Sequence, residues 1–247
     1  MLNRICDGAA VSYGDPDRLV VLFSSVLAVP RDHFDYADIT RDLPYTKLFL
    51  RDHQPLLTYH TGIRGLSGSI HETAEFLRYF IDRLGPGRVT FMGISSGGYA
   101  ANLLGHWVGA DDVHLQSTVS FTDPAVRDAV GGGERIPGSF DSMAAFMQEH
   151  GLDPALMDLR RIIADHDGPA PLVRLYYPSG DAIDVLQAGR IADFPHVQAI
   201  AHPSRSHSFL GAALARAGIL YDDLAASVQD LRAQHPTGNA TRADEPA

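Results

Sequence analysis

The sequence contains little cysteine and no clustered positive charge. Cys6 is the single cysteine, which excludes an intrachain disulfide and a cysteine-based zinc site. Acidic residues outnumber basic ones by 30 to 20, the net charge is -10, and no run of five or more Lys or Arg residues occurs. Such a chain repels nucleic acid and anionic membranes, so neither is expected as a partner.

Long apolar segments are also missing. No stretch approaches the roughly 18 apolar residues of a membrane-spanning helix, and residues 1–14 lack the apolar run of about 7–15 residues typical of a signal peptide. Together with the lone cysteine, this pattern predicts a cytoplasmic protein. No His-x-x-x-His pair or carboxylate cluster indicates a metal site. We therefore expect catalysis without a metal or another cofactor.

Apolar residues make up 45% of the 247 residues, enough for one sizeable core. That composition excludes disorder of the whole chain, and the length fits a single α/β domain. We expect one domain over residues 1–233. Residues 234–247 are polar and hold two prolines, which predicts a flexible tail.

Buried-strand patterns alternate with helical patterns along the chain. Strands are predicted at 18–25, 46–50, 88–94, 113–121, 172–177 and 197–201, and helices at 69–84, 96–107, 143–150, 156–164, 185–192, 209–217 and 224–232. Ser69 and Glu72 form a capping box at the start of the first helix. The alternation is typical of a mostly parallel sheet with helices on both faces. Residues 122–165 interrupt it, and we predict that they form a short helical lid.

The motif that carries chemistry is Gly93-Ile94-Ser95-Ser96-Gly97. It matches G-x-S-x-G, follows a predicted buried strand and opens a predicted helix, which is the setting that a nucleophile elbow requires. A glycine-rich turn that binds phosphate at a helix start is the alternative. No lysine follows as in a P-loop and no GxGxxG is present, so the nucleophile is the favoured interpretation.

A serine nucleophile needs a base, and the base needs a carboxylate that orients it. His207 follows the last predicted strand, and Asp184 follows the strand before it. One helix and one strand fit between them and would bring both to the same sheet edge. Asp181 and Asp123 are alternatives for the acid, and would otherwise be turn or capping residues.

With these residues in this order, the chain resembles the α/β-hydrolases over about residues 18–232. The resemblance implies that Ser95 is the nucleophile, His207 the general base and Asp184 its orienting acid. It also implies an oxyanion hole made by the backbone N–H of Ser96 and a second donor after the first long strand. Many members have His-Gly-x there, whereas this chain has Ser24-Ser25-Val26. Val26 is the positional match for the second oxyanion-hole donor. The preceding residue, Ser25, is a candidate for binding substrate.

The segment from Arg51 to Gly68 leaves a strand at its carboxyl end, where open parallel sheets bind ligands. Tyr59, His60 and Arg64 could contact substrate there, or they could pack the loop on itself. Because the loop is locally basic, we hypothesise an anionic group on the substrate, with Arg64 as its partner.

The pattern as a whole predicts a serine hydrolase that cleaves or transfers an acyl group from a small-molecule ester or thioester. A homodimer is compatible with the sequence. A cofactor-free lyase or isomerase on the same scaffold is one alternative, because fold does not determine function. A non-catalytic binding module is another.

Overall fold

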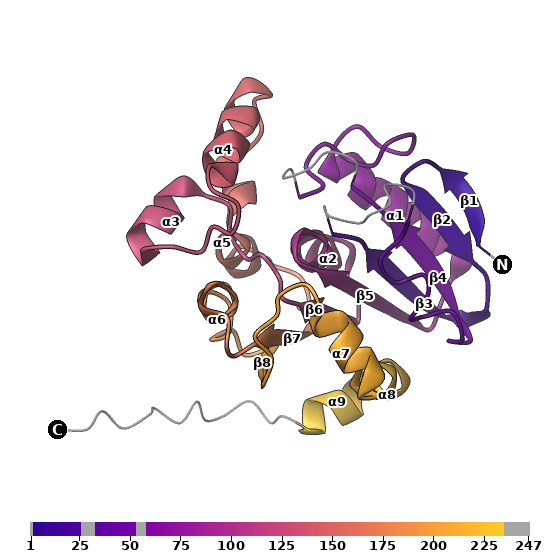
Figure 1. Ribbon diagram of the computed structural model, residues 1–247. Coiled ribbons are helices and arrows are strands. Elements are labelled where there is room, and N and C mark those ends of the chain that lie inside the picture. The colour runs from indigo at the N-terminus through magenta and orange to yellow at the C-terminus, as the bar shows by residue number, and fades with distance from the viewer. Residues whose placement is uncertain (1, 26–32, 53–57, 235–247) are drawn as a thin grey trace.

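The computed structural model describes residues 2–25, 33–52 and 58–234 (Figure 1). Its elements in chain order are β1 (Asn3–Cys6), β2 (Ala9–Ser12), β3 (Asp15–Phe23), β4 (Tyr45–Leu50), α1 (Ile70–Leu84), β5 (Arg88–Ile94), α2 (Ser96–Val108), β6 (Asp112–Gln116), α3 (Pro124–Val130), α4 (Ser139–Glu149), the 3₁₀ helix η1 (Pro154–Met157), α5 (Leu159–Ala164), β7 (Leu172–Pro178), α6 (Ala182–Gly189), β8 (Val197–His202), α7 (Leu210–Arg216), α8 (Ile219–Ala225) and α9 (Val228–Gln234).

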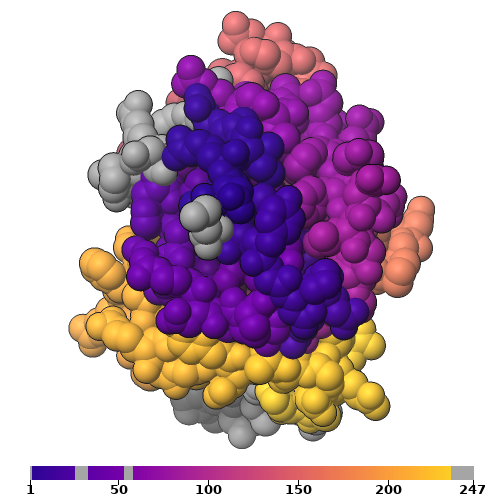
Figure 2. Space-filling view, turned by 90° about the vertical axis from the view of Figure 1, so that its right-hand side faces the viewer, coloured from indigo at the N-terminus to yellow at the C-terminus, as the bar shows by residue number. Residues whose placement is uncertain are grey.

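The strands of the described residues form one sheet of eight strands in the order β1-β2-β4-β3-β5-β6-β7-β8. Every pair from β4–β3 to β7–β8 is parallel, whereas β1–β2 and β2–β4 are antiparallel. The predicted mostly parallel sheet is confirmed. The hairpin of β1 and β2 was not predicted, because each strand has only four residues and β1 is largely exposed. Figure 2 shows this N-terminal segment at the surface.

The sheet separates two hydrophobic clusters. Alternate residues of β3 point to opposite faces, so Val21 and Phe23 join one cluster while Val20 and Leu22 join the other. Helices α1, α2, α5 and α6 contribute to the first cluster, and α7 and α8 to the second. The helices therefore cover both faces, as predicted, and they lie on opposite sides of the sheet in Figure 1.

Helix α1 has the predicted start and end. Ser69 Oγ accepts from the N–H of Glu72 at 3.2 Å, and the Glu72 carboxylate accepts from the N–H of Gly68 at 2.7 Å. Gly85 ends the helix in the left-handed conformation, with φ of 61°, which glycine adopts without steric cost. In the described ranges, no helix is long and apolar enough to cross a membrane.

Three of the differences from the predicted elements have a clear local reason. The strand predicted at 113–121 ends at Gln116, because Ser117 takes a positive φ of 46°. Residues 124–130 are helix α3 rather than loop, since Asp123 caps a helix that begins with Pro124. The helix predicted at 224–232 is divided into α8 and α9, and Ser227 caps the second by accepting from the N–H of Asp230 at 3.0 Å.

A buried network of charges joins the sheet to α8. Asp112 on β6 receives two hydrogen bonds from Arg88, both at 2.8 Å, and contacts His114 Nε2 at 2.6 Å. The other ring nitrogen of His114 lies 3.7 Å from Asp223, which also accepts from Arg174 at 3.0 Å. Burial by itself would raise the pKa of Asp112, but His114 and Arg88 outweigh it and hold that pKa at about 2. Burial would lower the pKa of His114, but Asp112 and Asp223 raise it above 6.5.

These shifts predict how stability depends on pH. Because the folded state raises the pKa of His114, its contribution to the free energy of unfolding is complete below about pH 6.5 and is lost as pH rises through the folded pKa. The variant His114→Gln lacks this contribution. We expect urea titrations to give a larger difference between wild type and variant at pH 6 than at pH 9. A difference that is equal at both pH values, or larger at pH 9, would contradict the assignment.

Candidate active site

Ser95 occupies the sharp turn between β5 and α2. Its φ of 54° and ψ of -121° are unusual for a residue with a side chain, and such strained backbone persists only where its surroundings impose it. The N–H of Ser95 donates to the carbonyl of Gln116 at 3.0 Å, and its carbonyl accepts from the N–H groups of Tyr99 and Val119, both at 3.2 Å. The neighbouring strand and the following helix therefore hold the turn.

The glycines around Ser95 are required by close packing. A Cβ atom on Gly93 would lie 2.2 Å from the carbonyl oxygen of Gly97, and one on Gly97 would lie 2.3 Å from that of Phe23. A Cβ on Gly98 would lie 2.3 Å from Thr118 Oγ1. Backbone atoms cannot move away easily, so the first two positions admit only glycine. Close packing therefore requires glycine on both sides of the serine.

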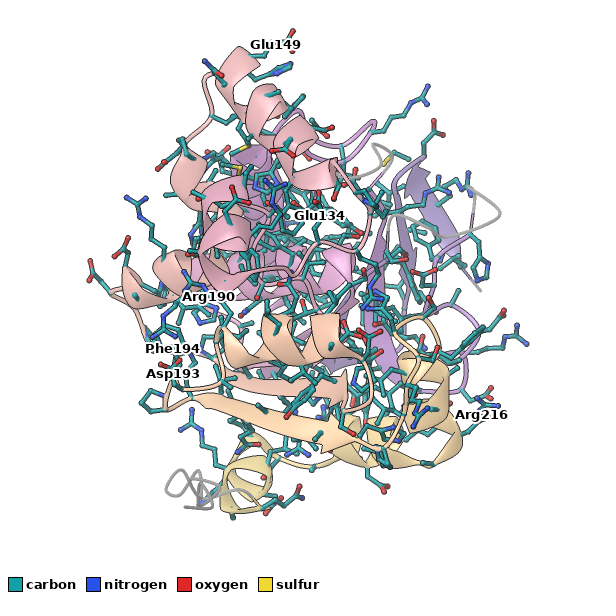
Figure 3. The ribbon with its side chains drawn as sticks, turned by 60° about the vertical axis from the view of Figure 1, so that its left-hand side comes forward. Glu134, Glu149, Arg190, Asp193, Phe194 and Arg216 are labelled. Carbon is teal, nitrogen blue, oxygen red and sulfur yellow. The ribbon has the colours of Figure 1, made fainter. Side chains whose placement is uncertain are left out.

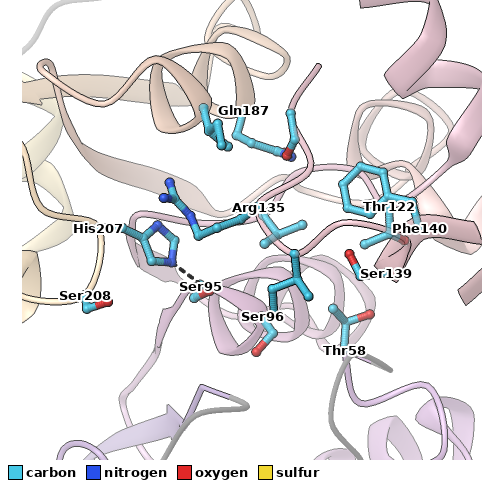
Figure 4. A pocket seen from close by; sticks show the side chains of 14 residues that line it. Thr58, Ser95, Ser96, Thr122, Arg135, Ser139, Phe140, Gln187, His207 and Ser208 are labelled. Atoms are coloured by element: carbon cyan, nitrogen blue, oxygen red, sulfur yellow. Dashed lines mark hydrogen bonds between the residues drawn. The ribbon is translucent and has the colours of Figure 1, made fainter. Parts of the chain in front are cut away.

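His207 and Asp184 reach Ser95 from the ends of the next strands. His207 lies between β8 and α7, and Asp184 lies in the first turn of α6, after β7. His207 Nε2 is 3.0 Å from Ser95 Oγ, and Nδ1 is 2.8 and 3.1 Å from the two carboxylate oxygens of Asp184. The tautomer with its proton on Nδ1 satisfies both contacts, since Nδ1–H then donates to Asp184 and Nε2 accepts from the serine hydroxyl. Figure 4 shows the His207–Ser95 contact.

The two alternative acids are capping residues. Asp123 accepts from the N–H of Ala125 at 2.8 Å and begins α3. Asp181 begins α6 and accepts from the N–H groups of Ile183 and Asp184 at 3.1 and 3.2 Å. Burial by itself would raise the pKa of Asp181, but hydrogen bonds, above all from Arg135, lower it overall. The expectation that the alternatives would be caps is confirmed, and Asp184 is the carboxylate that contacts the histidine.

Arg135 is a site residue that the sequence analysis missed. Its Nη2 lies 2.9 Å from Asp181 and 3.3 Å from the same Asp184 oxygen that is nearest to His207. It comes from the insertion, far from the motif in sequence, and an arginine in an irregular segment has no pattern that marks it. This contact connects the insertion directly to the carboxylate of Asp184.

A cavity of about 200 Å³ opens beside Ser95 and His207 (Figure 4). Its other lining residues are Thr58, Ser96, Val119, Thr122, Gly133, Arg135, Ile136, Ser139, Phe140, Ile183, Gln187 and Ser208. Six of these (Thr122, Gly133, Arg135, Ile136, Ser139 and Phe140) belong to the predicted insertion. The insertion therefore walls the cavity, whereas opening and closing of this wall stays a prediction.

The insertion packs against the rest of the protein. Met143 and Met147 are buried in the first hydrophobic cluster, so they are core residues and not an exposed apolar cover. Glu134 accepts from the N–H of Phe140 at 2.7 Å and stabilises the start of α4. Arg190, just after α6, pairs with Asp158. Figure 3 labels Glu134 and Arg190, which lie at two separate points of this region.

Two residues predicted to contact substrate, Tyr59 and Arg64, are absent from the described lining of the cavity. Tyr59 is fully buried, and its hydroxyl donates to the carbonyls of Ser24 and Leu50 at 2.8 and 3.1 Å. It packs the loop on the core, as the alternative proposed. Arg64 has a side chain that is 66% exposed and pairs with Asp7 at 3.6 Å, and it does not line the cavity. The anionic-group hypothesis based on Arg64 therefore has no support.

The remaining predicted residues divide between the site and its surroundings. Ser96 is the first residue of α2 and lines the cavity with Ser95. The N–H of Ser25 donates to Asp35 Oδ2 at 2.6 Å, so this hydrogen is engaged by Asp35. Val26 lies outside the described residues. His60 is buried, with Nε2 at 2.9 Å from the carbonyl of Leu156. Among the described residues, no cluster of three or more His, Cys, Asp or Glu side chains could hold a metal ion.

Comparison with known proteins gives structural matches only. No family model and no curated protein matches the sequence. The capsule O-acetyltransferase of Neisseria meningitidis serogroup A is similar with a TM-score of 0.62 and 14% identity, covering 91% of this chain and 92% of that one. The fluorophosphonate-binding serine hydrolase FphF of Staphylococcus aureus gives 0.57 and 13%, covering 90% and 96%.

A third similar structure is described as an α/β hydrolase. MGS-MChE2, an α/β hydrolase from the metagenome of sediments of the Mar Chica lagoon in Morocco, matches with a TM-score of 0.54 and 14% identity over 95% of this chain and 98% of that one. These likenesses agree with the mostly parallel eight-stranded sheet and with the strand–elbow–helix around Ser95. The chain has the α/β-hydrolase fold.

Proposed function

We propose that this protein is a serine hydrolase or acyltransferase in which Ser95, His207 and Asp184 form a catalytic triad. The observation that carries the proposal is the unbroken chain of contacts from Ser95 Oγ through both nitrogens of His207 to Asp184. Asp184 is 2% exposed and His207 13% exposed, so the base is held out of bulk water. A binding module would have no need of this strained and aligned arrangement.

The geometry supports a two-step acyl transfer. Ser95 Oγ attacks the substrate carbonyl carbon while His207 Nε2 takes the hydroxyl proton. The carbon–oxygen or carbon–sulfur bond to the leaving group then breaks, and His207 returns the proton to that group. Water or an acceptor alcohol attacks the resulting acyl-enzyme with the same base. Asp184 keeps the imidazole in the tautomer that accepts from the serine and stabilises the imidazolium that forms.

The start of α2 would stabilise the negative oxygen of the tetrahedral intermediate. The Ser96 N–H lies in the first turn of that helix, where peptide dipoles concentrate positive charge. The cavity has an apolar wall formed by Val119, Ile136, Phe140 and Ile183, which favours an apolar acyl group.

The likeness to an O-acetyltransferase and to a serine hydrolase supports acyl chemistry. It leaves hydrolysis and transfer as alternatives for the second step.

The first test concerns the nucleophile. Wild-type protein should react with a fluorophosphonate probe at one serine, whereas Ser95→Ala should not react, because the hydroxyl that attacks phosphorus is gone. The variant removes one oxygen and should keep the fold, which circular dichroism would check. Full labelling of a folded Ser95→Ala protein would exclude Ser95 as the nucleophile.

The second test separates the acid from its neighbour. Asp184→Asn should slow fluorophosphonate labelling by about 1,000-fold or more, because an amide cannot hold the imidazole in the productive tautomer. Asp181→Asn removes the same charge three residues away and still caps α6, so its labelling rate should stay close to that of wild type. Labelling by competitive mass spectrometry measures both rates. A large loss in Asp181→Asn with none in Asp184→Asn would reverse the assignment.

A further inference from the structure

Ser95 and His207 also border a second cavity of about 270 Å³. Its other described lining residues are Ser25, Asp35, Tyr36, Ile39, Ile94, Gln116, Ser208, Gly211 and Ala212. The two cavities share Ser95, His207 and Ser208. The first is walled by the insertion and α6, and the second by the segment after β3, the end of β6 and α7. Ser95 therefore lies where the two cavities adjoin.

In this arrangement the two parts of a bound ester, on either side of its scissile bond, would lie in different cavities. Ser96, at the start of α2, lines the first cavity and not the second. A carbonyl whose oxygen faces that helix start places its acyl chain in the apolar first cavity. The leaving group must lie near His207 to receive its proton, and the second cavity offers room on that side. The second cavity is thus suited to the alcohol portion of the substrate.

The second cavity has a negatively charged wall. Asp35 Oδ2 accepts from the Ser25 N–H at 2.6 Å, and the Asp35 N–H donates to Ser24 Oγ at 3.1 Å. In the part of the chain that the structure describes, no lysine or arginine forms an ion pair with Asp35, and His33 is the neighbour whose positive charge, when protonated, lowers the pKa of Asp35. Burial raises the pKa of Asp35, and the hydrogen bonds from Ser25 offset this only in part. A cation in the cavity would compensate this carboxylate.

The other polar groups of this wall add no positive charge. The Tyr36 hydroxyl donates to Gln116 Oε1 at 3.0 Å, which fixes both side chains. Apart from His207, the described lining residues include no basic side chain. In the first cavity, by contrast, Arg135 is neutralised by Asp181 and Asp184. Among the described residues, the second cavity places a carboxylate that has no lysine or arginine partner beside the proposed nucleophile.

We propose that the second cavity binds the alcohol portion of the substrate and that this portion carries an ammonium group facing Asp35. The proposal rests on the proposed role of Ser95 as nucleophile, since only then does a scissile bond lie between the cavities. It identifies Asp35 as the residue that selects for positive charge. It also excludes an anionic alcohol portion, because its charge would be repelled by Asp35.

Direct binding tests the site without relying on turnover. Choline and its neutral isostere 3,3-dimethylbutanol have nearly the same shape and differ in charge. Isothermal titration calorimetry on wild type should give choline an association constant about tenfold or more above that of the isostere. Asp35→Asn should abolish this preference, because Asn can still accept from the Ser25 N–H but carries no charge.

Asp38→Asn is the matched control. Asp38 lies in the same segment, is 66% exposed and pairs with Arg41, so its loss should leave the preference intact. Equal binding of the two alcohols by wild type, binding of neither, or a preference that survives in Asp35→Asn would each overturn the proposal. The wild-type comparison decides the matter even if a variant fails to fold.

Turnover then distinguishes failure of this site from failure of the proposed function. Acetylcholine should have a kcat/KM at least about tenfold above that of 3,3-dimethylbutyl acetate in wild type, and the ratio should approach one in Asp35→Asn, mainly through KM. Choline binding with no Ser95-dependent labelling would refute the catalytic proposal and leave the ammonium site standing. Ser95-dependent labelling with no preference for choline would refute the ammonium site alone.

Discussion

The backbone turn at Ser95 is the constraint on which the rest of the site depends. A serine with a φ of 54° must be held there by its neighbours, and the carbonyls of Gly97 and Phe23 leave no room for a side chain on either flanking glycine. The turn raises the hydroxyl above the carboxyl edge of the sheet and begins α2 immediately after it. The turn therefore positions both the proposed nucleophile and the start of α2, and replacing either flanking glycine would disturb both.

Parallel strand order brings the other groups to that hydroxyl. Since β5, β6, β7 and β8 are neighbours in one sheet, the segments that follow them emerge at the same edge. His207 and Asp184 meet Ser95 there, although 112 residues separate the serine from the histidine. The buried charges around His114 connect the same strands to α8 on one face of the sheet. The stability of the fold and the alignment of Ser95, His207 and Asp184 therefore depend on the same central strands.

Features that depend on a short stretch of sequence could be predicted from the sequence alone. The glycine-flanked serine, the capped helix α1 and the order of serine, acid and histidine all follow from local patterns and their chain order. Asp35 and Arg135 could not be found in this way, because their importance arises only when distant segments meet. Tyr59 and Arg64 were misplaced for the same reason, since a loop at the right edge can still turn its side chains into the core or into solvent. Strands β1 and β2 were not predicted, because a strand of four residues is too short to show a clear alternation of apolar and polar side chains.

The proposed mechanism requires that Ser95 becomes acylated during the reaction. Mixing the protein with p-nitrophenyl acetate, quenching with acid within the first turnover and sequencing the peptides by tandem mass spectrometry measures this directly. We predict an acetyl group on Ser95 that accumulates in wild type and is absent from His207→Ala. An acetyl group that forms equally in both proteins, or that resides on another residue, would contradict it.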